Sequence, residues 1–306
     1  MAQRPPSAAV LILHGGHETG IEPPPPGLLN LAGLRMRPFA RAVARATRRE
    51  GTHEAHDPHE AGDHPDSHEA GDHHDSHEVR DHHEVRDHHE ARGHREARGH
   101  REAHDDEREG GGRGPVLVRS VRYTHRGWNG AREDPLHDAV RALDELREEA
   151  GDIPVVLLGH SMGARAALRA ADHPSVRAVV GLAPWCPPGD PVTQLSGRDV
   201  VLLHSTRDRV TSPQATQSLT ARARRAGART CMITVRGGDH AMIRRAPAWH
   251  HLTAALVTGL LGLTSLPDPV TTALGLPLHA EATDGTLDLD RLRADRAGPA
   301  PAEPQR

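Results

Sequence analysis

Short runs of apolar residues alternate along the chain with segments whose apolar residues recur at helical spacing. The run AAVLIL at 8–13 is continuous and ends in His14-Gly15-Gly16, as is typical of a strand buried on both faces of a parallel sheet. Further strand-like segments are 115–123, 154–158, 176–182, 200–204 and 229–235. Because helical segments separate them, the pattern predicts an α/β fold. Its sheet is mostly parallel, has about six strands and carries helices on both faces.

Capping residues, prolines and glycines indicate where the helices begin and end. Asp134-Pro135 supplies an N-cap candidate and a first-turn proline, and Gly151 follows the last residue of that helix, Ala150. In the segment 34–50 we expect the helix to begin near Pro38, since proline is tolerated in a first turn. The other predicted helices are an alanine-rich one that ends at Ala171, and the segments 213–226 and 247–263.

The stretch 52–108 interrupts this alternation with a repetitive, highly charged sequence. It holds 15 of the 26 histidines, 18 acidic residues and 7 arginines, in repeats such as HEAGDH and HEVRDH. Its few apolar side chains cannot offset the entropy of ordering it, so we expect a disordered low-complexity insertion in a surface loop. Two alternatives remain: adventitious or buffering binding of Zn²⁺ or Ni²⁺ at residues 53–104, and a pH-responsive segment.

The length of 306 residues allows one or two domains. We interpret residues 1–51 and 109–265 as a single folded domain that contains the insertion. From residue 266 onward the chain is rich in proline and aspartate and has weak periodicity. We therefore expect residues 266–306 to form a C-terminal appendage that is disordered in part.

Composition and charge exclude several classes of protein. Two cysteines, Cys186 and Cys231, cannot form a disulfide scaffold and favour a reducing compartment. The longest apolar run, 252–263, is shorter than the ~18–20 residues needed to cross a bilayer, and the first ten residues lack the pattern of a signal peptide. A formal charge of −4, without a basic stripe carrying aromatics, gives nucleic-acid binding little support. We expect a cytoplasmic protein with neither a membrane nor a nucleic-acid partner.

The motif with the most chemical content is GHSMG at 159–163, between a predicted strand and an alanine-rich helix. On a tight strand-to-helix turn, a strained backbone lifts the hydroxyl of Ser161 away from the structure. Gly159 and Gly163 keep side chains out of the crowded flanks. The free N–H groups of the following helix, that of Met162 first, point toward an anion forming at the serine. The pattern predicts a nucleophile.

Two possible partners of this serine follow in the chain. Asp208 lies just past one predicted strand and His240 just past the next, and open α/β sheets gather their sites at the carboxyl ends of strands. A serine needs a base to take its proton, and the base needs a carboxylate to fix its tautomer. The chain offers a serine, an acid and a base in this order, as Ser161, Asp208 and His240. The alternative acids are Asp190, Asp199 and Asp239.

The loop after the first strand is a candidate oxyanion hole. We expect the N–H of Gly16 to be its donor beside that of Met162, with His17 as the second choice. His17 is also a candidate pocket residue. Trp128 and Trp185 follow strand ends, where site loops collect, so either could line an acyl pocket or serve ordinary packing.

These motifs give the chain a recognisable likeness. On LILHGG, GHSMG, HSTRDRVTSP and GGDHAM, it resembles the α/β-hydrolase superfamily, and it is most similar to compact bacterial members near the dienelactone-hydrolase and serine-aminopeptidase-like groups. The resemblance implies Ser161 as nucleophile, His240 as base and Asp208 as acid, with the Gly16 and Met162 amides as the hole. The first two strands usual in the superfamily and a large cap are absent, and dienelactone hydrolases proper use cysteine where this chain has serine.

Together, these observations favour a serine hydrolase that cleaves a small ester, thioester or amide through an acyl-enzyme. The small-molecule acyl substrate is expected to be an ester more than a peptide, and neither a cofactor nor a catalytic metal is expected. The rival hypothesis is a non-catalytic protein of hydrolase fold whose histidine-rich tract binds a divalent metal. The oligomeric state stays open.

Overall fold

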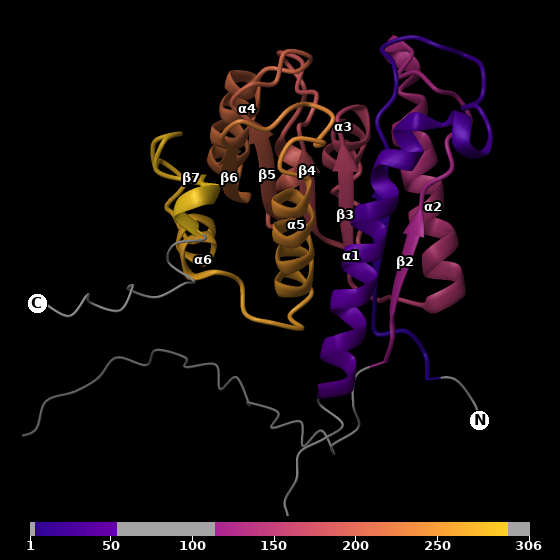
Figure 1. The fold of residues 1–306 in the computed structure, drawn as a ribbon, viewed down its shortest axis with the longest axis horizontal. Helices are drawn as coiled ribbons and strands as arrows, with labels where there is room; N and C mark the ends of the chain where they lie inside the picture. The colour runs from indigo at the N-terminus through magenta and orange to yellow at the C-terminus, as the bar shows by residue number, and fades with distance from the viewer. Residues whose placement is uncertain (1–3, 54–113, 293–306) are drawn as a thin grey trace, which may run out of the picture. The chain divides into compact units, whose positions relative to one another are not determined.

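The computed structural model describes residues 4–53 and 114–292 of the chain. Within these residues, seven parallel strands form one sheet in the order β2-β1-β3-β4-β5-β6-β7 (Figure 1). The fold predicted from the sequence is therefore confirmed, with one strand more than expected. The strands are β1 (Ala8–Leu13), β2 (Val116–Ser120), β3 (Val155–His160), β4 (Val176–Leu182), β5 (Asp199–Ser205), β6 (Arg229–Val235) and β7 (Thr286–Asp288).

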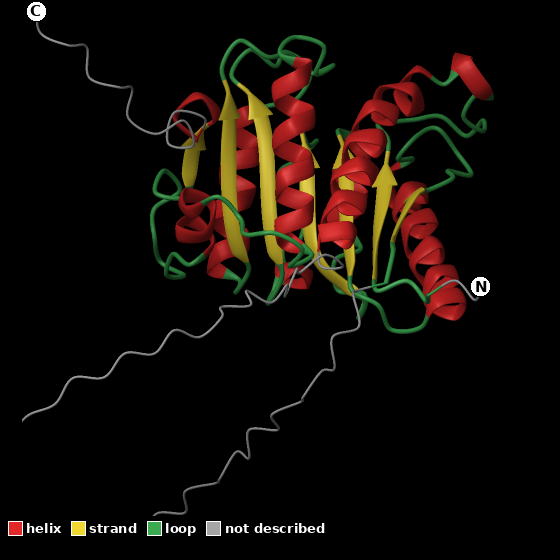
Figure 2. Cartoon of the chain, turned by 60° about the horizontal axis from the view of Figure 1, so that its bottom comes forward, coloured by secondary structure: helices red, strands yellow, loops and turns green. Residues whose placement is uncertain are grey.

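Helices cover both faces of this sheet (Figure 2). Helices α2 (Asp134–Ala150), α3 (Met162–Arg169) and α4 (Pro213–Arg225) bury their apolar sides on one face. Helices α1 (Leu31–His53), α5 (Ala246–Leu260) and α6 (Asp268–Leu274) cover the other. Three short 3-10 turns complete the described elements: η1 (Gly27–Leu29), η2 (Gly130–Arg132) and η3 (Thr193–Leu195).

The two layers explain why the strands read as unbroken apolar runs. In β1, Ala9 and Leu11 belong to the core under α2, α3 and α4, whereas Val10 and Ile12 belong to the core under α1, α5 and α6. All six residues of β1 and all six of β3 are buried. Since neither face meets water, the polar alternation of a half-exposed strand is absent.

Helix α1 begins earlier than the sequence suggested. It starts at Leu31, and Pro38 lies inside it rather than in its first turn. Asn30 explains the earlier start, because its side-chain Oδ1 accepts the N–H of Gly33 at 2.8 Å and its carbonyl accepts that of Leu34 at 2.8 Å. The cap therefore fixes the start of the helix, and Pro38, inside the helix, lacks the N–H that would donate to the Leu34 carbonyl.

The segment after residue 265 is part of the fold and not an appendage over its described length. Helix α6 buries Val270, Ala273 and Leu274, and β7 pairs with β6 at the edge of the sheet. The buried guanidinium of Arg224 donates to the carbonyls of Thr230 (2.9 Å) and Glu281 (3.3 Å), which fastens this segment to the body. Residues 293–306 lie outside the described part of the chain.

The predicted insertion at 52–108 lies almost entirely outside the described residues. Helix α1 continues to His53, so the first two residues of that range are helical, and apart from His53 the residues of the metal-binding hypothesis lie beyond it, as does most of the pH-responsive segment. The described chain resumes at Gly114, whose carbonyl accepts the Ser7 hydroxyl at 2.6 Å. Ser7 directly precedes β1, so the chain re-enters at the end of the sheet where the parallel strands begin.

Two glycines of the fold give a matched test of close packing. A Cβ on Gly163 would lie 2.4 Å from the Leu13 carbonyl oxygen and 2.5 Å from that of His14, whereas a Cβ on Gly275 would meet nothing closer than 3.5 Å. We expect Gly163→Ala to lower the free energy of unfolding by about 3 kcal/mol or more. Gly275→Ala should change it by less than about 1 kcal/mol. Equal midpoints of chemical unfolding for the two variants would contradict the packing described here.

Candidate active site

Ser161 stands on a strained turn between β3, which ends at His160, and α3, which begins at Met162. Its backbone angles are φ 52° and ψ −116°, a region that non-glycine residues rarely adopt and that costs about 1–3 kcal/mol. A Cβ on Gly159 would lie 2.5 Å from the Cα of Ala164, so only glycine lets the helix approach the strand this closely. The turn predicted from GHSMG is present, and strain of this kind is typical of a functional position.

The three side chains singled out from the sequence converge at the carboxyl ends of the strands. Ser161 Oγ lies 3.1 Å from His240 Nε2, and His240 Nδ1 lies 2.8 Å from Asp208 Oδ2. An ionised carboxylate can only accept, so the Nδ1–H of His240 donates to Asp208 and leaves Nε2 to accept the serine hydroxyl proton. The serine is 9% exposed and the Asp208 side chain is fully buried, so the serine lies closer to solvent than the carboxylate does.

Asp208 is held by five donors. Its Oδ1 accepts the N–H groups of Val210 and Thr211 at 2.8 and 2.9 Å, and its Oδ2 accepts the Thr211 hydroxyl at 3.0 Å besides the two histidines His204 and His240. Burial alone would raise the pKa of this carboxyl. The hydrogen bonds from His204, His240 and the loop amides outweigh burial and hold the pKa well below its usual range. The carboxylate is therefore ionised at neutral pH.

The rival carboxylates are engaged elsewhere. Asp190 forms a two-pronged ion pair with Arg165 (2.7 Å for each contact), and Asp199 pairs with Arg229 at 2.5 Å. Asp239 accepts the N–H of Ile243 at 2.9 Å within its own turn. Among the four candidate acids, only Asp208 contacts the His240 ring.

A second histidine, His204, contacts the same carboxylate and was not identified from the sequence. It is fully buried; its Nε2 lies 3.2 Å from Asp208 Oδ2 and its Nδ1 lies 2.8 Å from Thr216 Oγ1. With Thr216 donating to Nδ1, the Nε2–H of His204 donates to Asp208, so the carboxylate is clamped between two imidazoles. The sequence held a signal for this contact, because His204 precedes Asp208 by four residues at the end of a strand.

His160 contacts the backbone of His240. Its Nε2 lies 2.9 Å from the carbonyl oxygen of His240, and the two rings are 4.9 Å apart. Burial, followed by the neighbouring His240, lowers the pKa of His160 to about 3. The ring is therefore neutral at ordinary pH, and its Nε2–H donates to the His240 carbonyl.

The loop after β1 packs against the turn at Ser161 and offers one of the two expected hole donors. A Cβ on Gly15 would lie 3.4 Å from the Ser161 Cβ, and one on Gly16 would collide with the Met162 side chain at 2.3 Å. The N–H of His17 already donates to the Arg126 carbonyl at 3.0 Å, so His17 is excluded as the hole donor. The amides of Gly16 and Met162 remain as the candidate pair.

A cavity of about 440 Å³ opens onto Ser161 and His240. His14, Gly16 and His17 form one wall, and the segment from Pro24 to Arg35 forms another. His17, a candidate pocket residue, lies in this wall. Trp128 and Trp185 do not line this cavity. They lie edge to face at 6.2 Å against the guanidinium of Arg165, which sits 3.9 and 4.5 Å from the two ring centres.

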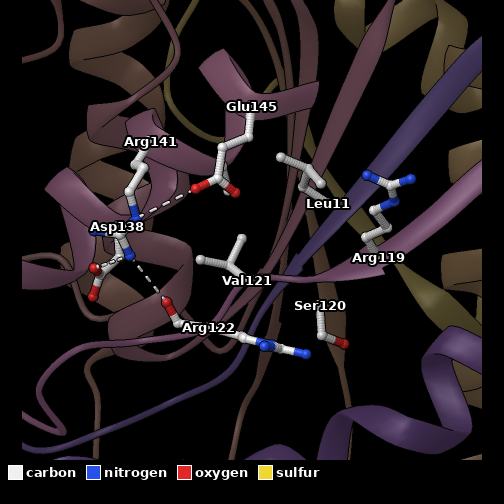
Figure 3. Close-up of a pocket in the computed structure, with 9 residues that line it drawn as sticks. Leu11, Arg119, Ser120, Val121, Arg122, Asp138, Arg141 and Glu145 are labelled. Carbon is white, nitrogen blue, oxygen red and sulfur yellow. Dashed lines mark hydrogen bonds and ion pairs between the residues drawn. The ribbon is translucent and has the colours of Figure 1, made fainter. Parts of the chain in front are cut away.

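A second hollow lies between β2 and α2 and has a different character (Figure 3). Arg141 extends over it, 3.7 Å from Glu145 and 2.5 Å from the buried Asp138. Asp138 also accepts the N–H and the hydroxyl of Thr124 at 2.7 and 2.8 Å. These charges satisfy one another and join the chain after β2 to α2, so this hollow is a structural feature.

Comparison with known proteins finds one family profile that matches part of the chain. Residues 106–199 match the sequence profile of the family described as serine aminopeptidase, S33. No curated protein is detectably similar to this chain in sequence. In the described part of the chain, every helix is too short or too polar to span a bilayer.

Three solved structures resemble parts of the chain. A Xanthomonas campestris protein assigned to the α/β-hydrolase superfamily is 13% identical over 83% of this chain and 98% of its own, with a TM-score of 0.42. An α/β serine hydrolase homologue from Coxiella burnetii is 14% identical over 40% and 58%, with a TM-score of 0.36. A protein of unknown function from Agrobacterium tumefaciens, described as an α/β hydrolase, is 15% identical over 49% and 71%, with a TM-score of 0.41. This chain therefore spans less than two thirds of the Coxiella protein.

The parallel sheet, with a strained serine between a central strand and the following helix, defines the α/β-hydrolase fold. Together with the profile match at residues 106–199, this places the chain in the α/β-hydrolase superfamily.

Proposed function

We propose that this protein is a serine hydrolase that cleaves a small ester, thioester or amide through an acyl-enzyme. The observation that supports this proposal is the unbroken chain of contacts from Ser161 Oγ to His240 (3.1 Å) and from His240 to Asp208 (2.8 Å) on a strained turn. These distances suit direct proton transfer between the hydroxyl and the imidazole. A serine that only packed a helix onto the sheet would require neither the imidazole nor the buried carboxylate.

In the proposed reaction, Ser161 Oγ attacks the carbonyl carbon while its proton passes to His240 Nε2. The electron pair of the carbonyl bond moves to its oxygen, and the N–H groups of Gly16 and Met162 stabilise that oxyanion. Asp208 holds the imidazole in the correct tautomer and stabilises its cationic form. When the tetrahedral intermediate collapses, His240 gives its proton to the leaving alcohol, thiol or amine, and the acyl group stays on Ser161.

Water then releases the acyl group by the same route in reverse. His240 takes a proton from the water as its oxygen attacks the acyl carbonyl, and returns it to Ser161 Oγ as the ester bond to the serine breaks. The products are a carboxylic acid and the free enzyme. We favour an ester because the cavity is open and no large cap or exopeptidase anchor stands over Ser161 in the described chain. Because the chain is similar in part to serine aminopeptidases, the proposed substrates include an amide.

A fluorophosphonate probe tests the proposal directly, because it reacts with activated serines. We expect one covalent adduct on the wild-type protein, which mass spectrometry of its peptides should map to Ser161. Ser161→Ala should abolish the adduct. Ser120→Ala, at an exposed serine in the second hollow, should label like the wild type. An adduct of undiminished yield on Ser161→Ala would refute the assignment of the nucleophile.

A further inference from the structure

The charged side chains that line the cavity at Ser161 are all basic. Arg35 and Arg126 line it together with His14 and His17, and none of the 16 described residues that form its wall is aspartate or glutamate. Asp208 lies behind His240 with its side chain fully buried, and its five donors already satisfy it. A ligand in this cavity therefore meets positive charge that no acidic side chain of the wall offsets.

Arg35 is the arginine of this wall that lacks a partner. Arg126 is paired with Glu22 at 3.0 Å, whereas Arg35 has no ion pair or hydrogen bond among the described residues. Arg35 is half-buried in the second turn of α1. Its charge also reaches the site, since it adds to the effects of burial and His240 that lower the pKa of His160.

The rim of the same cavity is apolar. Three exposed side chains line it: Leu29 (73% exposed), Leu31 (70%) and Val210 (71%). Contact of these apolar side chains with water does not stabilise the protein. An apolar rim around one uncompensated cation fits an amphiphilic ligand. Such a ligand would cover the leucines with a hydrocarbon part and present an anion to the guanidinium.

We propose that Arg35 binds an anionic group, a carboxylate or a phosphate, on the ester substrate of this site. The inference rests on the proposed function and adds the substrate class to it. The planar guanidinium offers two parallel N–H donors to either anion, so both share the same recognition chemistry. Arg35 acts here as a binding and specificity residue, and the bond-breaking steps remain those of Ser161 and His240.

Paired esters that differ only in charge test the inference. The first pair is the 4-nitrophenyl monoester of adipic acid and 4-nitrophenyl hexanoate, in which the charge lies on the acyl side. The second is 4-acetoxybenzoate and its methyl ester, in which the charge lies on the leaving group. 4-Acetoxyphenyl phosphate, compared with the methyl ester, replaces the carboxylate by a phosphate. The readout is the ratio of kcat/KM for the anionic ester to that for the neutral ester.

We expect Arg35→Gln to lower this ratio by about 10- to 100-fold in at least one comparison, as loss of a charged hydrogen bond does. Arg35→Lys keeps the charge and should lower it less. Arg37→Gln is the matched control, because Arg37 is exposed on the same helix and lines a different cavity, which does not contain Ser161. A ratio within about twofold of wild type for Arg35→Gln in every comparison would overturn the inference.

Binding measured without turnover separates this inference from the proposed function. In Ser161→Ala protein, titration calorimetry should give tighter binding for 4-acetoxybenzoate than for its methyl ester, and adding Arg35→Gln should remove the difference. If this holds while the wild type neither hydrolyses esters nor reacts with the fluorophosphonate, the proposed function fails and the anion site stands. If the wild type hydrolyses esters without regard to their charge and the titration finds no difference, the anion site fails and the hydrolase stands.

Discussion

Replacing Ser161 by alanine is expected to lower kcat for 4-nitrophenyl acetate by about 10⁴- to 10⁶-fold. The hydroxyl that forms the acyl-enzyme would be gone, and the water that replaced it would lack the position that the turn at 161 provides. His240→Ala should cost about as much, because an unactivated serine is a poor nucleophile at neutral pH. Since the two side chains act as one unit, the double variant should lose little more than either single variant.

The measurement is steady-state turnover of the wild type, both single variants and the double variant, with thermal unfolding as a check of folding. Losses that multiply in the double variant would contradict a shared mechanism, because they would mean that the serine and the imidazole act independently. A Ser161→Ala protein that keeps more than about a tenth of the wild-type kcat would remove Ser161 from the reaction.

Asp208→Asn is expected to lower kcat by about 10⁴-fold while the fold is preserved. The asparagine side chain is nearly the same shape, but its amide would present an N–H to His240 Nδ1 where the carboxylate accepts one. The imidazole would then carry its proton on Nε2, facing Ser161, and could not accept the serine proton. Asp190→Asn is the control, because Asp190 contacts Arg165 and not His240. A comparable loss in both variants would argue for a general effect on folding.

The same substitution predicts a pH dependence of stability. The folded pKa of Asp208 is lowered from its unfolded value of about 3.9, so its ionised form stabilises the fold. That contribution is fully present above about pH 4 and is lost as pH falls through the folded pKa. The difference in unfolding free energy between wild type and Asp208→Asn should therefore shrink in acid. Urea unfolding between pH 7 and pH 3 measures it, and a difference that stays constant would contradict the lowered pKa.

Periodicity predicted the central sheet because both of its faces are buried. The strands β1, β3, β4, β5 and β6 are mostly apolar, and their bounds agree with the prediction to within a few residues. Strand β7 could not be found this way, since three residues of edge strand carry no period and depend on pairing with β6. Likewise, the start of α1 depends on the Asn30 cap, whereas the predicted start relied on the more conspicuous Pro38.

The residues of the site divide in the same way. The sequence separations placed Ser161, Asp208 and His240 at one edge, because parallel strands bring their carboxyl ends together. The sequence could not predict the contacts that only the folded chain makes. His204 reaches Asp208 from inside the sheet, and the amide of His17 is taken by the Arg126 carbonyl. Trp128 packs on Arg165 because the chain between them folds back, and the separation of these residues in the sequence does not predict this contact.

The positions of His53 and Gly114 in the fold have a consequence for how this protein can change. Helix α1 runs away from Ser161 to His53, and Gly114 resumes beside Ser7, at the end of the sheet where the strands begin (Figure 1). Extra residues between these two points add no strain to the loops around the serine, which all lie at the far end. This junction is therefore a permissive site, where a change in chain length leaves the loops around Ser161 in place.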